Sequence, residues 1–153
     1  MTTTQTMGLM ERLKVETRPQ HDKAEQGGFG TRVMQGGLTR QMYAAHLVAW
    51  RRLLAHLEDA LRGSEDPIVA GVWHEGLSKE AVLECDIDAL DAAGTALNAQ
   101  TESGIAHFCT FIDGLAESNP PALLGPLYVL EGSTLGGTIM KPRIAAQLGL
   151  EDG

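Results

Sequence analysis

The sequence predicts an all-α protein, and two observations support that fold class. Apolar residues recur every three or four positions along several stretches, which is the spacing of one face of an α-helix. No stretch keeps the alternation of apolar and polar residues that a half-buried strand shows, and no internal repeat is present. A chain of 153 residues with 43% hydrophobic content is long enough to bury one core without disulfides. We therefore expect a single multi-helix domain over residues 1–153.

The first half of the chain predicts two long helices separated by glycines. The first helix begins at Met7, and one stripe of it carries Leu9, Leu13, Thr17 and Ala24. The glycine-rich segment 27–37 is expected to end this helix and to form a connection. Residues 39–62 give the clearest pattern, with Thr39 as the expected N-cap. Their predicted apolar face consists of Tyr43, Leu47, Trp50, Leu54, Leu57 and Leu61.

The second half predicts shorter helices and then a long apolar segment. One short helix is expected near Pro67 and another after Ser78, whereas residues 86–98 are weakly patterned. A further helix is expected over residues 103–116. Its predicted apolar face consists of Ile105, Phe108, Cys109, Ile112 and Ala116. The SNPP motif predicts that one helix ends and another begins there, with Ser118 or Asn119 as the cap and the prolines in the first turn. The last long segment is apolar but contains several glycines.

Charge and cysteine content exclude several classes of function. The net charge is -8, and the twelve basic residues are scattered, so we expect no nucleic-acid partner. Cys85 and Cys109 lie in separate segments and form no CxxC pair, so neither a zinc site nor a disulfide framework is predicted. No signal peptide and no run of about 18 apolar residues occurs, which predicts a soluble cytoplasmic protein without membrane insertion.

The first predicted helix carries an unusual histidine in the motif ETRPQHDKAEQ. His21 falls at the margin of the apolar stripe, with Lys14 two turns before it and Glu25 one turn after it. A carboxylate at i+4 could hold one ring nitrogen and orient the other toward a metal or a cofactor. On this helix alone, a surface or boundary position is the commoner role of such a histidine. Pro19 is expected to bend the helix unless a new helix starts there.

The motif EGSTLGG, residues 131–137, places three glycines inside a predicted helix. Each glycine costs on the order of 1 kcal/mol relative to alanine in a helix interior, so something must require them. On a helical wheel Gly125, Gly132 and Gly136 share one face, which is bare backbone bordered by apolar side chains. Close approach of another helix is the commoner explanation. The alternative is a flat ligand that lies against this strip.

The remaining candidates favour packing or solvent rather than chemistry. We expect His46 to pack, His56 and His107 to face solvent, and Tyr43 and Trp50 to belong to the core. The acidic motif ECDIDALD has no EXXH partner elsewhere, so the di-iron site of helical bundles is not predicted.

A helix with a boundary histidine and a helix with a glycine face could together hold a planar macrocycle. The segments LKVETRPQHDKAE, residues 13–25, and YVLEGSTLGG, residues 128–137, resemble the proximal and distal helix segments of the heme oxygenase family, in particular its bacterial branch. The intervening long helix with Tyr43 also lies where that family places one. The resemblance spans most of the chain and implies an all-α, heme oxygenase-like domain.

The resemblance implies a role for each residue of the first motif. His21 would be the proximal ligand of the heme iron, and Glu25 would be the partner that orients its ring. Lys14 would meet a heme propionate, as a cation should meet a carboxylate at the mouth of a pocket. In this family heme is both substrate and cofactor.

The resemblance also assigns the second motif. Gly132 and Gly136 would press bare backbone toward the face of the heme where oxygen binds, and Gly137 would contact the heme. Many family members have an aspartate that organises water for proton delivery where this chain has Ser133. A serine hydroxyl holds a water but donates protons less readily, so Thr134 and ordered water would substitute for the aspartate, or turnover would be slow.

The implied reaction is oxidative cleavage of heme to biliverdin, carbon monoxide and ferrous iron. Because the chain has no GxGxxG fingerprint, electrons would come from an external ferredoxin or flavin reductase. Two alternatives remain, a heme-binding sensor or carrier that leaves the ring intact and a protein of the same fold that binds another ligand or only a partner protein. Family members usually continue with further helices beyond the position of Gly153. The expectations are therefore a truncated chain, a naturally short form, or a pocket completed by another chain.

Overall fold

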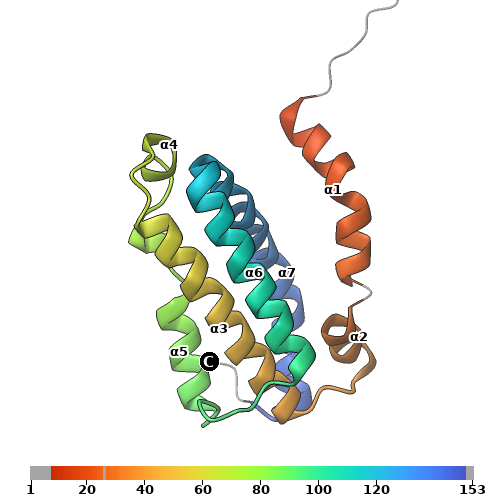
Figure 1. Ribbon diagram of the computed structural model, residues 1–153. Helices are drawn as coiled ribbons and strands as arrows, with labels where there is room; N and C mark the ends of the chain where they lie inside the picture. Colours follow the sequence, from red (N-terminus) through yellow and green to blue (C-terminus); the bar gives the residue numbers. More distant parts are fainter. Residues whose placement is uncertain (1–7, 26, 151–153) are drawn as a thin grey trace, which may run out of the picture.

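The computed structural model describes residues 8–25 and 27–150, without the side chains of residues 9, 10, 24, 25 and 134–136. All regular structure in these residues is helical, which confirms the predicted fold class (Figure 1). The elements are α1 (Leu9–Glu25), α2 (Gly28–Gln35), α3 (Arg40–Arg62), α4 (Pro67–Ala70), the 3₁₀ turn η1 (Glu75–Leu77), α5 (Glu80–Ala89), α6 (Ala99–Ser118), the 3₁₀ turn η2 (Pro120–Leu123) and α7 (Leu124–Leu148). Across the described ranges, no helix has the length and apolarity of a membrane span.

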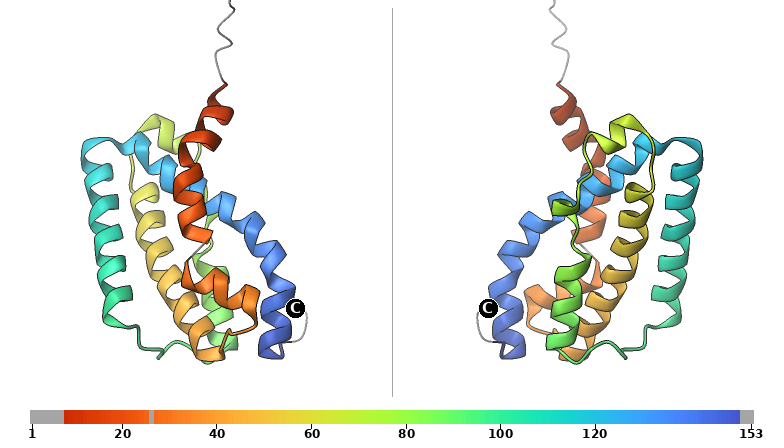
Figure 2. Two further views of the ribbon diagram at one scale, coloured as in Figure 1. Left: turned by 90° about the vertical axis from the view of Figure 1, so that its right-hand side faces the viewer. Right: turned by 90° about the vertical axis from the view of Figure 1, so that its left-hand side faces the viewer.

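The body of the molecule is built around α3, which packs against α5 and α6 and contacts the start of α7 (Figure 1, Figure 2). One apolar cluster joins α3, α4, α6, η2 and α7, and a second joins α3 to α5. The buried members of the first are Leu57, Leu61, Val69, Ile112, Leu123 and Leu127. Those of the second are Ala44, Leu47, Ile87 and Ala92. Burial of these side chains provides most of the favourable free energy of folding.

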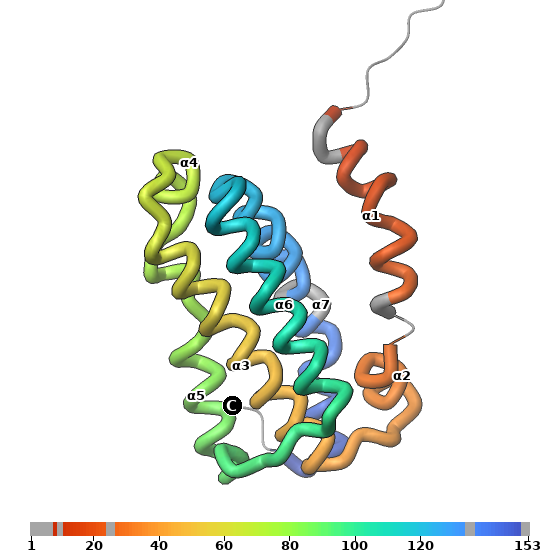
Figure 3. The backbone as a smooth tube through the Cα atoms, viewed as in Figure 1, coloured from red at the N-terminus to blue at the C-terminus, as the bar shows by residue number. Residues whose placement is uncertain are grey.

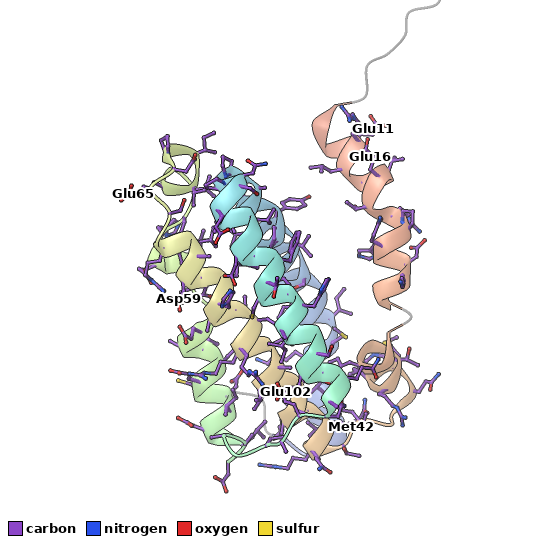
Figure 4. The ribbon with its side chains drawn as sticks, in the orientation of Figure 1. Glu11, Glu16, Met42, Asp59, Glu65 and Glu102 are labelled. Atoms are coloured by element: carbon purple, nitrogen blue, oxygen red, sulfur yellow. The ribbon has the colours of Figure 1, made fainter. Side chains whose placement is uncertain are left out.

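Helix α3 has the N-cap and the face that its sequence predicts. The Thr39 side chain accepts a hydrogen bond from the Met42 backbone N–H at 3.2 Å, and Gly63 follows the last turn. The leucines of the predicted face are buried, whereas Tyr43 and Trp50 are only partly buried and lie at its edge. Polar side chains join α3 to α6. Arg52 forms an ion pair at 2.8 Å with Glu102, which Figure 4 labels. The His56 Nε2 atom lies 2.7 Å from the Asp113 Oδ1 atom, so the prediction that His56 faces solvent holds only in part.

Two predicted boundaries were wrong. The glycine-rich segment 27–37 contains helix α2, which ends at Gly36 with a left-handed φ of 76°. Tertiary burial of Val33 outweighs the low helix propensity of glycine here. Helix α6 begins at Ala99 because the Asn98 side chain accepts from the Thr101 backbone N–H at 2.8 Å. The SNPP motif ends α6 at Ser118 and begins η2 with the prolines in its first turn, as predicted, but Asn119 at the cap position makes no side-chain cap hydrogen bond.

Helix α1 stands apart from the α3–α6–α7 body (Figure 1). It runs through Pro19 without interruption, and two ion pairs one turn apart support it, Arg12 with Glu16 at 3.2 Å and Arg18 with Asp22 at 2.9 Å. None of its described side chains is buried. Packing of an apolar face normally stabilises a helix in a protein, so little in the described chain holds α1 from the side.

Helix α7 continues through the glycine motif and through Pro142. It bends in its middle, where the glycines lie, so that its two halves run in different directions (Figure 2). Glycine pairs and prolines are the usual causes of such bends.

Candidate functional site

His21 lies on α1 with an exposed side chain. Because the helix is continuous, Lys14 lies two turns before His21 on the same face, and its side chain is also exposed. Glu25 ends this helix, but its side chain lies outside the described residues. The structure therefore presents an imidazole and an ammonium group on one open face of α1.

The glycine strip of α7 faces open space. A Cβ atom added at Gly125, Gly132 or Gly137 would meet nothing within 4 Å outside its own helix. Close approach of another helix was the commoner explanation for the strip, and among the described residues it is wrong at Gly125 and Gly132; Gly137, beside the strip, is equally open. Gly136 belongs to the same helix, but what surrounds it lies outside the described residues. Something other than a described helix must account for the bare backbone.

Ser133 follows the first glycine of the motif and is exposed. Its Oγ donates a hydrogen bond to the Leu130 backbone carbonyl at 2.7 Å. A hydroxyl has one proton and two acceptor positions, so Ser133 in this rotamer can accept from a water but does not pass on its own proton. Thr134, the expected substitute, lies outside the described residues.

An apolar groove of ≈ 550 Å³ continues the glycine strip along α7. Its walls come from α3, α6, η2 and the first half of α7, and Gly125 belongs to both the strip and the groove. The lining residues are Trp50, Leu53, Phe108, Phe111, Leu115, Ala122, Gly125, Pro126, Val129 and Leu130. The sequence did not single out Phe111, because it lies off the predicted apolar face of α6. The only sequence signal at Phe111 was an aromatic side chain one turn from Phe108 and outside the predicted apolar face.

His46 packs, as predicted, against Phe29 and against Trp50, which lines this groove. Its ring stacks on Phe29 of α2 with centroids 3.6 Å apart and an interplanar angle of 4°, and it meets Trp50 edge-on at 6.0 Å. Burial lowers the pKa of His46 from 6.5 to about 4, so the ring is neutral at pH 7.

This neutral ring predicts a loss of stability in acid. Below pH 6.5 the unfolded chain binds a proton at His46 that the folded chain binds only near pH 4, so the free energy of unfolding falls as the pH falls through this window. We expect a loss of about 1–3 kcal/mol by pH 4. Urea unfolding at pH 7 and at pH 4.5 measures it. A His46→Phe variant, which keeps the stack on Phe29, should lose less stability, and an equal loss in both proteins would contradict the assignment.

Comparison with known proteins decides the family. The heme oxygenase family model matches residues 7–153 of the sequence. The chain belongs to the heme oxygenase family. Among solved structures, heme oxygenase-1 from the cyanobacterium Synechocystis sp., in complex with heme, resembles this heme oxygenase family member with a TM-score of 0.80 and 20% sequence identity. The match covers 96% of this chain and 67% of that one, and it shows a shared fold. No curated protein sequence matches the chain significantly.

This member of the heme oxygenase family has no cluster of protein metal ligands in the part that the structure describes. No three His, Cys, Asp or Glu side chains come together there. A porphyrin supplies four nitrogens to its own iron, so a heme site needs only a single axial residue from the protein. A single histidine such as His21 is compatible with that requirement.

Proposed function

We propose that the chain is a heme oxygenase that cleaves heme to biliverdin, carbon monoxide and ferrous iron, with electrons from a ferredoxin or a flavin reductase. The open glycine strip of α7 is the observation that supports this most strongly. Glycines in a helix cost on the order of 1 kcal/mol each, and no described helix comes within 4 Å of a Cβ added at Gly125 or Gly132 to offset that cost. A flat ligand that binds against the strip would explain why glycines occupy these positions. Family membership and the heme complex of the Synechocystis enzyme favour heme as that ligand.

The residues fit such a ligand in their chemistry. His21 would ligate the iron, Lys14 would pair with a propionate, and Gly132 and Gly137 would lie against the ring. The apolar groove beside the strip would exclude water from the ring edge. A ligand between α1 and α7 would also cover the face of α1 that packs on nothing described. Heme is the substrate, and its iron supplies the redox chemistry.

The chain would contribute to the reaction mainly through the absence of side chains at the glycines of α7. Bare backbone at Gly132 and Gly137 offers no side chain that could ligate the iron or protonate a bound group from the α7 side. Ser133 donates to the Leu130 carbonyl, so it would hold a water through its acceptor positions. Proton delivery would then depend on ordered water, and turnover would be slow compared with a site that has an aspartate.

A heme carrier or sensor is the second candidate, and the Ser133 hydrogen bond favours it. Ferric heme titrated into the protein, followed by ascorbate in air with catalase present, separates the candidates. The enzyme must bind heme saturably and then lose its Soret band toward a biliverdin spectrum. A carrier keeps the Soret band. A protein that only shares the fold and binds another ligand gives no saturable heme spectrum.

The Gly132→Leu variant tests the strip itself. The added side chain would occupy the space that the ring needs, and overpacking of about 1–3 kcal/mol corresponds to a roughly 10–100-fold weaker heme affinity. The fold should not suffer, because a Cβ at this position meets nothing within 4 Å. Leucine should instead stabilise the helix by about 0.5–1 kcal/mol. Heme titration and urea unfolding measure the two effects.

Gly104→Leu is the matched control. Gly104 is an exposed helical glycine of α6 whose added Cβ also meets nothing within 4 Å. This variant should gain similar stability and keep the wild-type heme affinity. Equal heme affinity in Gly132→Leu and in wild type would remove the strip from the binding site.

A further inference from the structure

We propose that Gln147 is a positioning residue, which sets the separation between the helix that carries His21 and the glycine strip by holding α2 on the end of α7. The importance of that separation for heme binding depends on the proposed function. The hydrogen bonds of Gln147 and the placement of α2 on α7 do not depend on the proposed function.

The Gln147 side chain makes two hydrogen bonds to backbone more than a hundred residues away. Its Nε2 donates to the Val33 carbonyl at 2.7 Å, and its Oε1 accepts from the Leu38 N–H at 3.1 Å. Val33 is in the last turn of α2, where carbonyls have no partner within the helix, and Leu38 follows the left-handed turn at Gly36. One amide therefore satisfies a carbonyl in the last turn of α2 and the N–H of the residue that follows the turn after it. We call this pair of bonds the Gln147 bridge.

The surroundings of the bridge make it difficult for water to replace. Val33 is 1% exposed and Leu38 is 6% exposed. A backbone carbonyl and an N–H left without partners in such a place cost more than an ordinary exposed hydrogen bond. The bridge also specifies one placement of α2 on α7, which apolar contact alone would not, because a hydrogen bond is directional and burial is not.

Helix α1 inherits its position from α2. Only two residues lie between the end of α1 at Glu25 and the start of α2 at Gly28, so the two helices are neighbours in the chain, and Figure 3 shows α2 near the end of α1. No described side chain of α1 is buried, so side-on packing by these residues contributes little to its placement. The Gln147 bridge and the glycine strip both belong to α7. The path from the strip through Gln147 and α2 to α1 therefore determines how far His21 lies from the strip.

The first test measures this distance in the protein without heme. Nitroxide labels on cysteines at Val15 and Ile139, which are 56% and 72% exposed, report the separation of α1 and α7 by pulsed EPR after Cys85 and Cys109 are replaced by serine. Gln147→Met keeps the side-chain volume but removes both hydrogen bonds, so we expect a broader distance distribution. The same replacement at exposed Gln100 of α6 is the control and should leave the distribution unchanged.

The second test is ferric heme titration of the same two variants. Gln147→Met should bind heme about tenfold more weakly and show a smaller histidine-ligated fraction in its absorption spectrum. An unchanged label distance would overturn the inference directly. A broader distance with unchanged heme affinity and spectrum would reduce Gln147 to a stabilising residue and overturn its positioning role. If wild type shows no His21-dependent heme binding, the proposed function fails, and the label distances still decide whether the bridge positions α1.

Discussion

His21→Ala is expected to lose the histidine-ligated spectrum of bound ferric heme and to weaken heme affinity by about 100-fold or more. Removal of a residue that only supports a ligand costs metal sites roughly 10–100-fold, and removal of the ligand itself should cost at least as much. The variant should fold normally, because the His21 side chain is exposed and no described core residue depends on it. Absorption and EPR titrations measure the affinity and the iron ligation together.

Two comparisons make this result specific. His107 is an exposed histidine of α6, and His107→Ala should keep the wild-type affinity and spectrum. Free imidazole should restore a nitrogen-ligated spectrum to His21→Ala, since the missing group is a ligand rather than part of the fold. Identical titrations of wild type and His21→Ala would return His21 to the role of a surface residue and leave the proposed function without its iron ligand.

Glu58→Ala is expected to lower the free energy of unfolding by about 3–5 kcal/mol, because it removes two hydrogen bonds to a buried charge at roughly 1.5–3 kcal/mol each. Glu58 of α3 is 2% exposed. Its carboxylate accepts from the Ser78 hydroxyl at 2.5 Å and from the Lys79 backbone N–H at 2.8 Å, directly before α5. Both donors would be left without a partner. Thermal unfolding should shift down by roughly 10 °C.

We expect the Glu58→Ala substitution to weaken a contact with α7 as well. The Lys79 ammonium group contacts the Leu77 carbonyl at 3.1 Å and the Glu131 carboxylate at 2.9 Å, and Glu131 directly precedes Gly132. Asp59→Ala is the matched control, since Asp59 is the next residue of α3 but points outward to pair with Arg62 (Figure 4). An exposed pair of this kind contributes about 0.5 kcal/mol. Similar unfolding free energies for the two variants would show that the buried carboxylate contributes no more than a surface charge.

The sequence by itself determined the features that depend on neighbouring residues. The repeat of apolar residues along α3 predicted its buried leucines, Thr39 predicted its start, and the absence of alternation predicted an all-α fold. The spacing of Lys14 and His21 placed them on one helical face, as the structure has them. These features require only the geometry of a helical turn and the hydrogen bonds of its first residues, so they can be deduced within a short window.

Only the tertiary structure decided what lies against each helical face. The glycine motif was compatible with a close helix or with a flat ligand, because both require small residues at the same spacing. Within the described part of the chain nothing lies within 4 Å of a Cβ added at Gly132, so no described helix takes the first role there. Helix α2 forms in a glycine-rich segment because Val33 is buried in the folded chain. The burial of Glu58 and the Gln147 bridge likewise join distant segments. Local periodicity shows which face of a helix is apolar, but only the folding of distant residues onto it determines its neighbour.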